Sequence, residues 1–169
     1  MEQTELWNEL IRKFNQWIKF EKNVFLPNTE YFSPDAITYL TEDDIIKWAY
    51  KTRDELLAQR IDHVISLKNR AIDLMNYADK TLFPITDGLI KLCGSLVHEF
   101  RKESDAITKI IEYFETEPGY RRDKKLKEAY TMLRESEESI RRFIALFGEV
   151  FKQFKGKGYY LDNLEIDIA

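Results

Sequence analysis

Residues 41–83 contain neither proline nor glycine, and their apolar side chains recur at spacings of three and four. This spacing is typical of an amphipathic helix. Thr41 and Asp44 match a capping box, which satisfies free backbone donors at the start of a helix. The sequence therefore predicts a single helix of roughly forty residues, about 60 Å long. Its apolar stripe comprises Ile45, Ala49, Leu57, Ile61, Val64, Ala71, Met75, Ala78 and Leu82.

A helix of this length needs partners of similar length to bury its stripe, and two such partners follow in the chain. The first runs from about residue 84 to residue 115, and Pro84 suits its first turn. The second runs from about residue 123 to residue 155, after a turn signal at Pro118 and Gly119. Both keep a heptad spacing of apolar residues, which is the spacing of coiled-coil packing.

A shorter helix from about residue 4 to residue 22 precedes the long ones and carries an unusually aromatic stripe. Aromatic rings in such a stripe usually cover a groove between longer helices, and an exposed docking face for a partner is the alternative. Residues 23–33 are irregular but apolar, so we expect them to pack over one end of the bundle. Ser33 before Pro34 predicts a short helix over residues 34–40.

These elements predict an all-α protein. It is an antiparallel four-helix bundle with three long helices, one shorter N-terminal helix and a non-helical C-terminal tail. The chain of 169 residues is long enough for one core. We therefore expect a single helical domain over residues 1–158 and an extended tail over residues 159–169.

A net charge of −4 argues against wholesale coating of nucleic acid, although a local basic patch can still bind it. The single cysteine, Cys93, excludes a disulfide within the chain and favours a reducing compartment. No apolar run is long enough for a membrane span, and the N-terminus lacks the pattern of a signal peptide. These features predict a cytoplasmic protein that does not enter a membrane.

Residue patterns that indicate catalysis are missing from the sequence. Di-iron carboxylate bundles need Glu-x-x-His pairs, but the only histidines, His63 and His98, follow Arg60 and Ser95 at that spacing. There is no paired-cysteine metal motif, no phosphate-binding loop and no nucleophile elbow. The sequence therefore predicts no enzymatic activity, no metal and no cofactor.

Three charged residues interrupt the predicted apolar stripes. Lys68, Glu103 and Glu137 each take a heptad position where an apolar residue is expected. Folding the chain at Pro84 and Pro118 places them within about one helical turn of the same height. One interpretation is a buried polar layer that sets the register of the helices. The other is that these long side chains lie at the edge of the stripe and reach water.

Residues 120–127 are the most basic stretch of the chain. The candidate nucleic-acid-binding residues are Tyr120, Arg121, Arg122, Lys124, Lys125 and Lys127. The cations would contact phosphates, and the tyrosine would stack on a base. A helix spreads such groups around its axis, and cations near a helix N-terminus are unfavourable. A solvated tip of the bundle is therefore the alternative.

From Leu164 onward, apolar and acidic residues alternate strictly, which is the period of a β-strand. An all-helical protein has no sheet edge with which such a strand could pair. The tail can be frayed, can fold back along a groove of the bundle, or can pair with a sheet of another protein. In the last case Leu164, Ile166 and Ile168 would enter pockets of the partner.

The missing catalytic patterns favour a non-enzymatic protein–protein interaction or scaffold module that acts with a protein partner. The alternative is a nucleic-acid-binding helical small subunit of a ribonucleoprotein complex. The two functions differ in salt dependence, because phosphate binding weakens steeply as the salt concentration rises. The sequence leaves the oligomeric state open.

Overall fold

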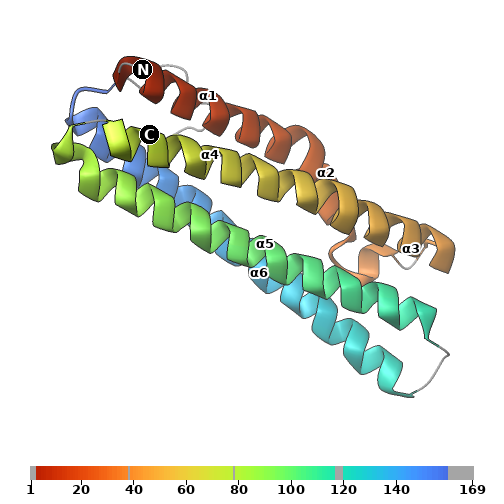
Figure 1. The fold of residues 1–169 in the computed structure, drawn as a ribbon. Coiled ribbons are helices and arrows are strands. Elements are labelled where there is room, and N and C mark those ends of the chain that lie inside the picture. Colours follow the sequence, from red (N-terminus) through yellow and green to blue (C-terminus); the bar gives the residue numbers. More distant parts are fainter. Residues whose placement is uncertain (1–2, 38, 78, 117–119, 160–169) are drawn as a thin grey trace.

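The computed structural model describes residues 3–37, 39–77, 79–116 and 120–159, without the side chains of residues 37 and 120–123. Helices account for 93% of the described residues, and no strand occurs among them. One short and three long helical rods lie side by side in an elongated bundle (Figure 1). The predicted all-α four-helix bundle is thereby confirmed.

The rods are connected so that neighbours in sequence run in opposite directions (Figure 1). α1 (Gln3–Phe20) is the short rod, and α5 (Phe83–Glu115) and α6 (Tyr120–Gly156) are two of the long ones. The third long rod runs from Glu42 to Tyr77 and includes α4 (Ala58–Tyr77). α4 packs against both α1 and α5, and α5 packs along α6.

The rod from Glu42 to Tyr77 begins as predicted, because the Thr41 hydroxyl accepts a hydrogen bond from the Asp44 N–H at 3.2 Å. The expectation of one unbroken helix to residue 83 is wrong in two respects. A π-helical turn, η4 (Thr52–Leu57), separates α3 (Glu42–Lys51) from α4. The rod also ends early, since the Asp79 side chain accepts a hydrogen bond from Thr81 N–H at 2.9 Å and starts a 3₁₀ turn, η5 (Lys80–Leu82).

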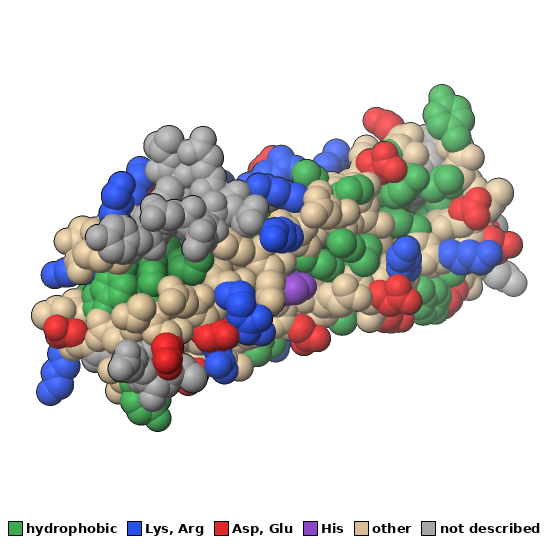
Figure 2. All heavy atoms as spheres, turned by 90° about the horizontal axis from the view of Figure 1, so that it is seen from above, with side chains coloured by type: hydrophobic (Ala, Val, Ile, Leu, Met, Phe, Trp, Pro, Cys, Tyr) green, Lys and Arg blue, Asp and Glu red, His purple; other side chains and the backbone are tan. Residues whose placement is uncertain are grey.

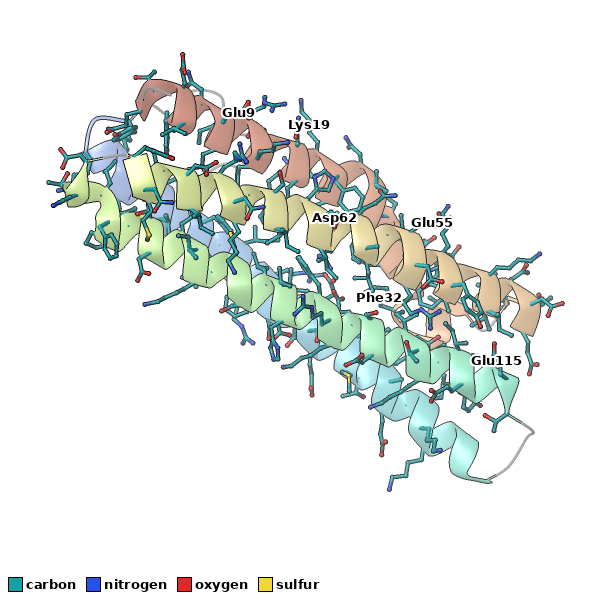
Figure 3. All side chains as sticks on the ribbon, in the orientation of Figure 1. Glu9, Lys19, Phe32, Glu55, Asp62 and Glu115 are labelled. Atoms are coloured by element: carbon teal, nitrogen blue, oxygen red, sulfur yellow. The ribbon has the colours of Figure 1, made fainter. Side chains whose placement is uncertain are left out.

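The π turn lies within the buried stripe of the rod. Thr52, Leu56 and Leu57 are all buried, so the turn places two adjacent leucines in the core. A π turn holds more residues than an α turn, which lets both side chains reach the interior. Glu55 is exposed and lies on the outer side of the rod (Figure 3).

Residues 21–37 continue from α1 and take the fourth position of the bundle beside α3. They form η1 (Glu21–Phe25, a π turn), α2 (Leu26–Asn28), and the 3₁₀ turns η2 (Thr29–Tyr31) and η3 (Pro34–Ile37). The Asn28 amide donates to the Thr52 hydroxyl at 2.9 Å, and the Phe32 ring packs edge-on against Trp48. The short helix expected over residues 34–40 is therefore only a 3₁₀ turn.

Two apolar clusters fill the interior, one at each end of the bundle. The first joins α1 to α4, α5 and α6, and the aromatic stripe of α1 is buried in it. The second joins residues 20–32 to α3, α5 and α6. The largest side chains of the first cluster are Trp7, Phe14, Trp17, Phe100, Phe147, Phe151 and Phe154. Those of the second are Phe20, Phe25, Phe32, Trp48 and Tyr130.

α6 is followed by a glycine that reverses the chain. Gly158 has a φ of +92°, a conformation that residues with a side chain rarely adopt. This reversal lets the Tyr159 N–H donate to the Phe154 carbonyl at 3.2 Å. The Tyr159 ring then packs against Trp7, with 5.0 Å between the ring centroids. The last described residue is thus part of the bundle surface next to α1.

Candidate functional site

A single arginine, Arg60, lies between the two apolar clusters and is 1% exposed. Its Nε and Nη2 donate to the two carboxylate oxygens of Glu21, at 2.7 and 3.0 Å. Its Nη1 donates to Glu103 and to Glu137, each at 2.7 Å. These four residues are called the Arg60 cluster below. One cation therefore carries four charge-assisted hydrogen bonds to three carboxyl groups.

Each member of the Arg60 cluster comes from a different element. Arg60 lies in the first turn of α4, directly after the π turn η4, and Glu21 opens the π turn η1. Glu103 and Glu137 project from the middle of α5 and α6. The Trp17 indole N–H also donates to Glu21 Oε1, at 2.8 Å. The cluster therefore ties all four positions of the bundle together at one height.

Aromatic rings close the Arg60 cluster from two sides. The guanidinium carbon of Arg60 lies 3.8 Å from the centroid of the Phe25 ring and 4.5 Å from that of the Phe100 ring. Rings at this distance attract a cation through their negative faces and displace water from it. Since water screens charges strongly, its exclusion strengthens the ion pairs within the cluster.

Burial and neighbouring charges shift the pKa values of this cluster in opposite directions. Burial alone would lower the pKa of Arg60, but Glu21, Glu103 and Glu137 outweigh burial and raise that pKa, so the guanidinium stays charged. Burial raises the pKa of Glu103 well above its ordinary value of 4.5, despite the attraction of Arg60. Burial acts in the same direction on Glu137, but Arg60 and the hydrogen bond with Glu103 outweigh it and lower the pKa of Glu137.

The structure brings two of the three residues of the expected polar layer together. Glu103 is 0% exposed and Glu137 is 8% exposed, and both contact the same cation. That cation is Arg60, so the expectation for Lys68 is wrong. Lys68 is only half-buried and takes part in none of the ion pairs described for this part of the chain.

The reason for this error is the register of the buried stripe. α4 buries residues 60, 64, 67, 71 and 74, whereas the predicted stripe ran through residues 61, 64, 68, 71 and 75. Arg60 consequently lies at the centre of the stripe and Lys68 at its edge. Arg60 and Glu21 were missed by the sequence reasoning. The heptad spacing of Leu57, Arg60, Val64 and Leu67 is the sequence pattern that indicates a core position for Arg60.

The Arg60 cluster has no access to a described groove. The open groove between α5 and α6 is lined by polar side chains that include Glu99, Lys102 and Glu135, but by no member of the cluster. The groove beside α1 contains Trp7, Arg12 and Asn15, and again no member of the cluster. The contacts that the structure shows for the cluster all join side chains of the bundle to one another.

The cysteine and the two histidines differ in their burial. Cys93 is buried in the first apolar cluster, and burial raises the pKa of its thiol to about 12. The ring of His63 packs on Phe20, with 4.9 Å between centroids, and burial lowers the pKa of its imidazole. His98 is exposed. Within the described residues no group of three His, Cys, Asp or Glu side chains is arranged to hold a metal ion.

The basic stretch at residues 120–127 opens α6, and the side chains of Lys124, Lys125 and Lys127 are exposed there. The side chains of Tyr120, Arg121 and Arg122 lie outside the described part of the structure. The same holds for the proposed partner-binding residues Leu164, Ile166 and Ile168.

Large apolar side chains are exposed at both ends of the molecule and along its length. Eight large ones are exposed among the described residues, and four of these lie within residues 24–50. They are Val24, Leu26, Tyr39 and Tyr50, which together we call the end surface. Tyr39 is 95% exposed. Figure 2 shows hydrophobic side chains, with acidic and basic ones among them, over the end that carries α2 and α3.

Acidic residues surround this part of the chain. Glu42, Asp43 and Asp44 form the first turn of α3, where negative charge also suits the helix dipole, and all three are exposed. Glu30 and Asp35 are exposed on the preceding turns. The end surface therefore combines apolar and aromatic groups with negative charge.

No family model, no curated protein and no solved structure matches this chain. Among the described helices, none is both long enough and apolar enough to cross a membrane.

Proposed function

We propose that this protein is a non-enzymatic interaction module that binds another protein through the end surface. The observation that supports this function most strongly is the 95% exposure of Tyr39, in a segment that also exposes Val24, Leu26 and Tyr50. Tyrosine is enriched in protein interfaces because its ring provides a large contact area and its hydroxyl a hydrogen bond. An aromatic group that the fold leaves in water is suited to act as an anchor in a partner's pocket.

The buried Arg60 cluster supports the same proposal from inside the molecule. Its charged groups are used for contacts within the chain, and Cys93 is shielded from solvent. A helical rod whose cysteine and histidines line neither of the described grooves is suited to present a surface to a partner.

The test compares two exposed tyrosines at opposite ends of the bundle. Tyr39 belongs to the end surface, and Tyr77 is 72% exposed at the end of α4. We expect Tyr39→Ala to weaken binding of the native partner about thirtyfold, because interface anchors carry most of the binding energy. Tyr77→Ala is the matched control and should bind like the wild type.

The measurement is quantitative mass spectrometry of proteins that co-purify with each tagged variant from the native host, after nuclease treatment. Binding constants are then measured with the purified partner. Equal losses in both variants, or no loss in either, would show that the end surface does not carry the interaction.

A second candidate function is nucleic-acid binding at the start of α6. The observation that favours it is the exposure of Lys124, Lys125 and Lys127 within two turns of one helix end. Lysines that contact phosphates release counterions on binding, so their removal lowers both the affinity and its salt dependence.

We expect Lys124→Glu combined with Lys125→Glu and Lys127→Glu to abolish any binding of single-stranded RNA in a fluorescence anisotropy titration. The control carries the same substitution at Lys152, Lys155 and Lys157, which are exposed at the opposite end of α6. RNA binding that survives in the first variant and disappears in the second would place the site elsewhere.

A further inference from the structure

The charges of the Arg60 cluster do not balance. Glu21, Glu103 and Glu137 bring three carboxyl groups to one guanidinium, and the side chain of Glu103 is fully buried. If all three were ionised, the cluster would hold two more negative than positive charges. An uncompensated charge in a protein interior is so costly that the group usually takes up or loses a proton instead.

The arrangement of oxygen atoms indicates where a proton would reside. Glu21 receives two hydrogen bonds from one edge of the guanidinium and a third from Trp17, so its carboxylate is well compensated. Glu103 and Glu137 share the single nitrogen Nη1. The two carboxyl groups therefore meet at one donor, and each shifts the pKa of the other. A hydrogen bond between two carboxyl groups needs a proton on one of them.

Of the two carboxyl groups, that of Glu103 is better placed than that of Glu137 to carry this proton. Its Oε2 is buried without a donor among the described residues, as expected for an oxygen that carries a proton itself. The side chain of Glu137 is 11% exposed, and Arg141 adds positive charge near it, so Glu137 is the better carboxylate. The ionisable groups that act on the pair are thus Glu21 from η1, Arg60 from α4 and Arg141 from α6.

We propose that the Arg60 cluster is a proton-binding site, in which the folded protein at neutral pH holds one proton between the carboxyl groups of Glu103 and Glu137. The Glu103 hydroxyl donates to the Glu137 carboxylate, and the proton is released to solvent when the bundle unfolds. With this proton bound, the cluster holds two negative charges and one positive charge. This property goes beyond the proposed interaction function and does not depend on it.

A bound proton makes the stability of the bundle depend on pH in a defined direction. The pKa of Glu103 is raised in the folded state, so its contribution is present below the ordinary value of 4.5 and is lost as pH rises above that value. The pKa of Glu137 is lowered, so its contribution is lost only as pH falls below 4.5. Between pH 5 and 7 the folded pair binds one proton more than the unfolded chain. One such proton increases the unfolding equilibrium constant about tenfold per pH unit.

The test is the pH dependence of urea unfolding in the wild type and in Glu103→Gln. The glutamine amide donates to Glu137 as the protonated carboxyl does, but it takes up no proton. We expect the ratio of the wild-type to the variant unfolding constant to rise about a hundredfold between pH 5 and 7. Glu99→Gln is the matched control, because Glu99 lies one turn earlier on α5, is also buried and pairs with Lys102 outside the cluster. Its pH dependence should follow the wild type.

A direct measurement on the wild type covers the case in which Glu103→Gln does not fold. With ¹³C-labelled glutamate, one side-chain carboxyl carbon should keep the chemical shift of a protonated acid at pH 7. Glutamate carboxyl carbons that are all ionised at pH 7, or parallel pH profiles for the wild type and Glu103→Gln, would overturn the proposal.

Discussion

Arg60→Ala is expected to lower the free energy of unfolding by about 3–5 kcal/mol or more, which is the cost of removing one partner from a buried ion pair. The variant leaves Glu21, Glu103 and Glu137 without the cation that all three contact. It also leaves a void between the rings of Phe25 and Phe100. Urea denaturation at pH 7, followed by circular dichroism, measures this loss.

Lys68→Ala is the control for this experiment, because Lys68 lies two turns further along the same helix at the edge of the stripe. Its removal should change the free energy of unfolding by no more than about 0.5 kcal/mol. Replacing Arg60 and its three carboxylate partners together by apolar residues should cost far less than Arg60→Ala, since no charge then stays buried. Equal effects of Arg60→Ala and Lys68→Ala would contradict the buried cluster.

Deletion of Asn69 is expected to destroy the cooperative fold, whereas deletion of Glu55 should be tolerated. Both residues are exposed on the same helical rod. Removing one residue from an α-helix turns everything beyond it by about 100°. In α4 this turn would move Ala71 and Leu74 out of the core. In η4 the deletion removes the additional residue of the π turn, so the flanking stripes stay aligned as one α-helix.

Thermal unfolding measures the cooperativity and the midpoint temperature of the two deletion variants. The variant without Glu55 should keep a cooperative transition within a few degrees of the wild type, in line with a small change at an exposed position. Loss of the transition in both variants would mean that the π turn is required for reasons other than register.

The architecture could be predicted because the strongest signals in the sequence are long and local. Heptad spacing along α5 and α6 located their buried faces, and the turn signals at Pro84 and Pro118 set the order of the helices. Glu103 and Glu137 were recognised as polar interruptions for the same reason, since each breaks a regular series of apolar residues.

The cation of the cluster was missed because the prediction followed apolar residues. Ile61 is apolar and follows Arg60 directly, so the predicted stripe took residues 61 and 68 in place of residues 60 and 67. Glu21 was missed because its role depends on a second π turn, η1, at the end of α1. The pairing of Arg60 with Glu21 is determined by tertiary packing, which local propensity does not show.

The exposure of Tyr39 could not be predicted from the pattern of apolar residues. Periodicity identifies residues that must be buried, but it does not identify an aromatic residue that the fold leaves exposed between helices. Tyr39 lies in the connection between η3 and α3, where no periodic pattern applies. Its exposure became apparent only when residues 21–37 were placed beside α3.

The guanidinium of Arg60 offers the most direct test of how this bundle is organised. In a ¹H–¹⁵N spectrum at neutral pH, exposed arginine side chains exchange their protons rapidly with water and give broad, overlapped Nη signals. If Arg60 donates four hydrogen bonds to buried carboxyl groups, it should give resolved and slowly exchanging Nε–H and Nη–H signals that are absent from Arg60→Lys. Arg60 signals that exchange as fast as those of exposed Arg142 would contradict the buried cluster.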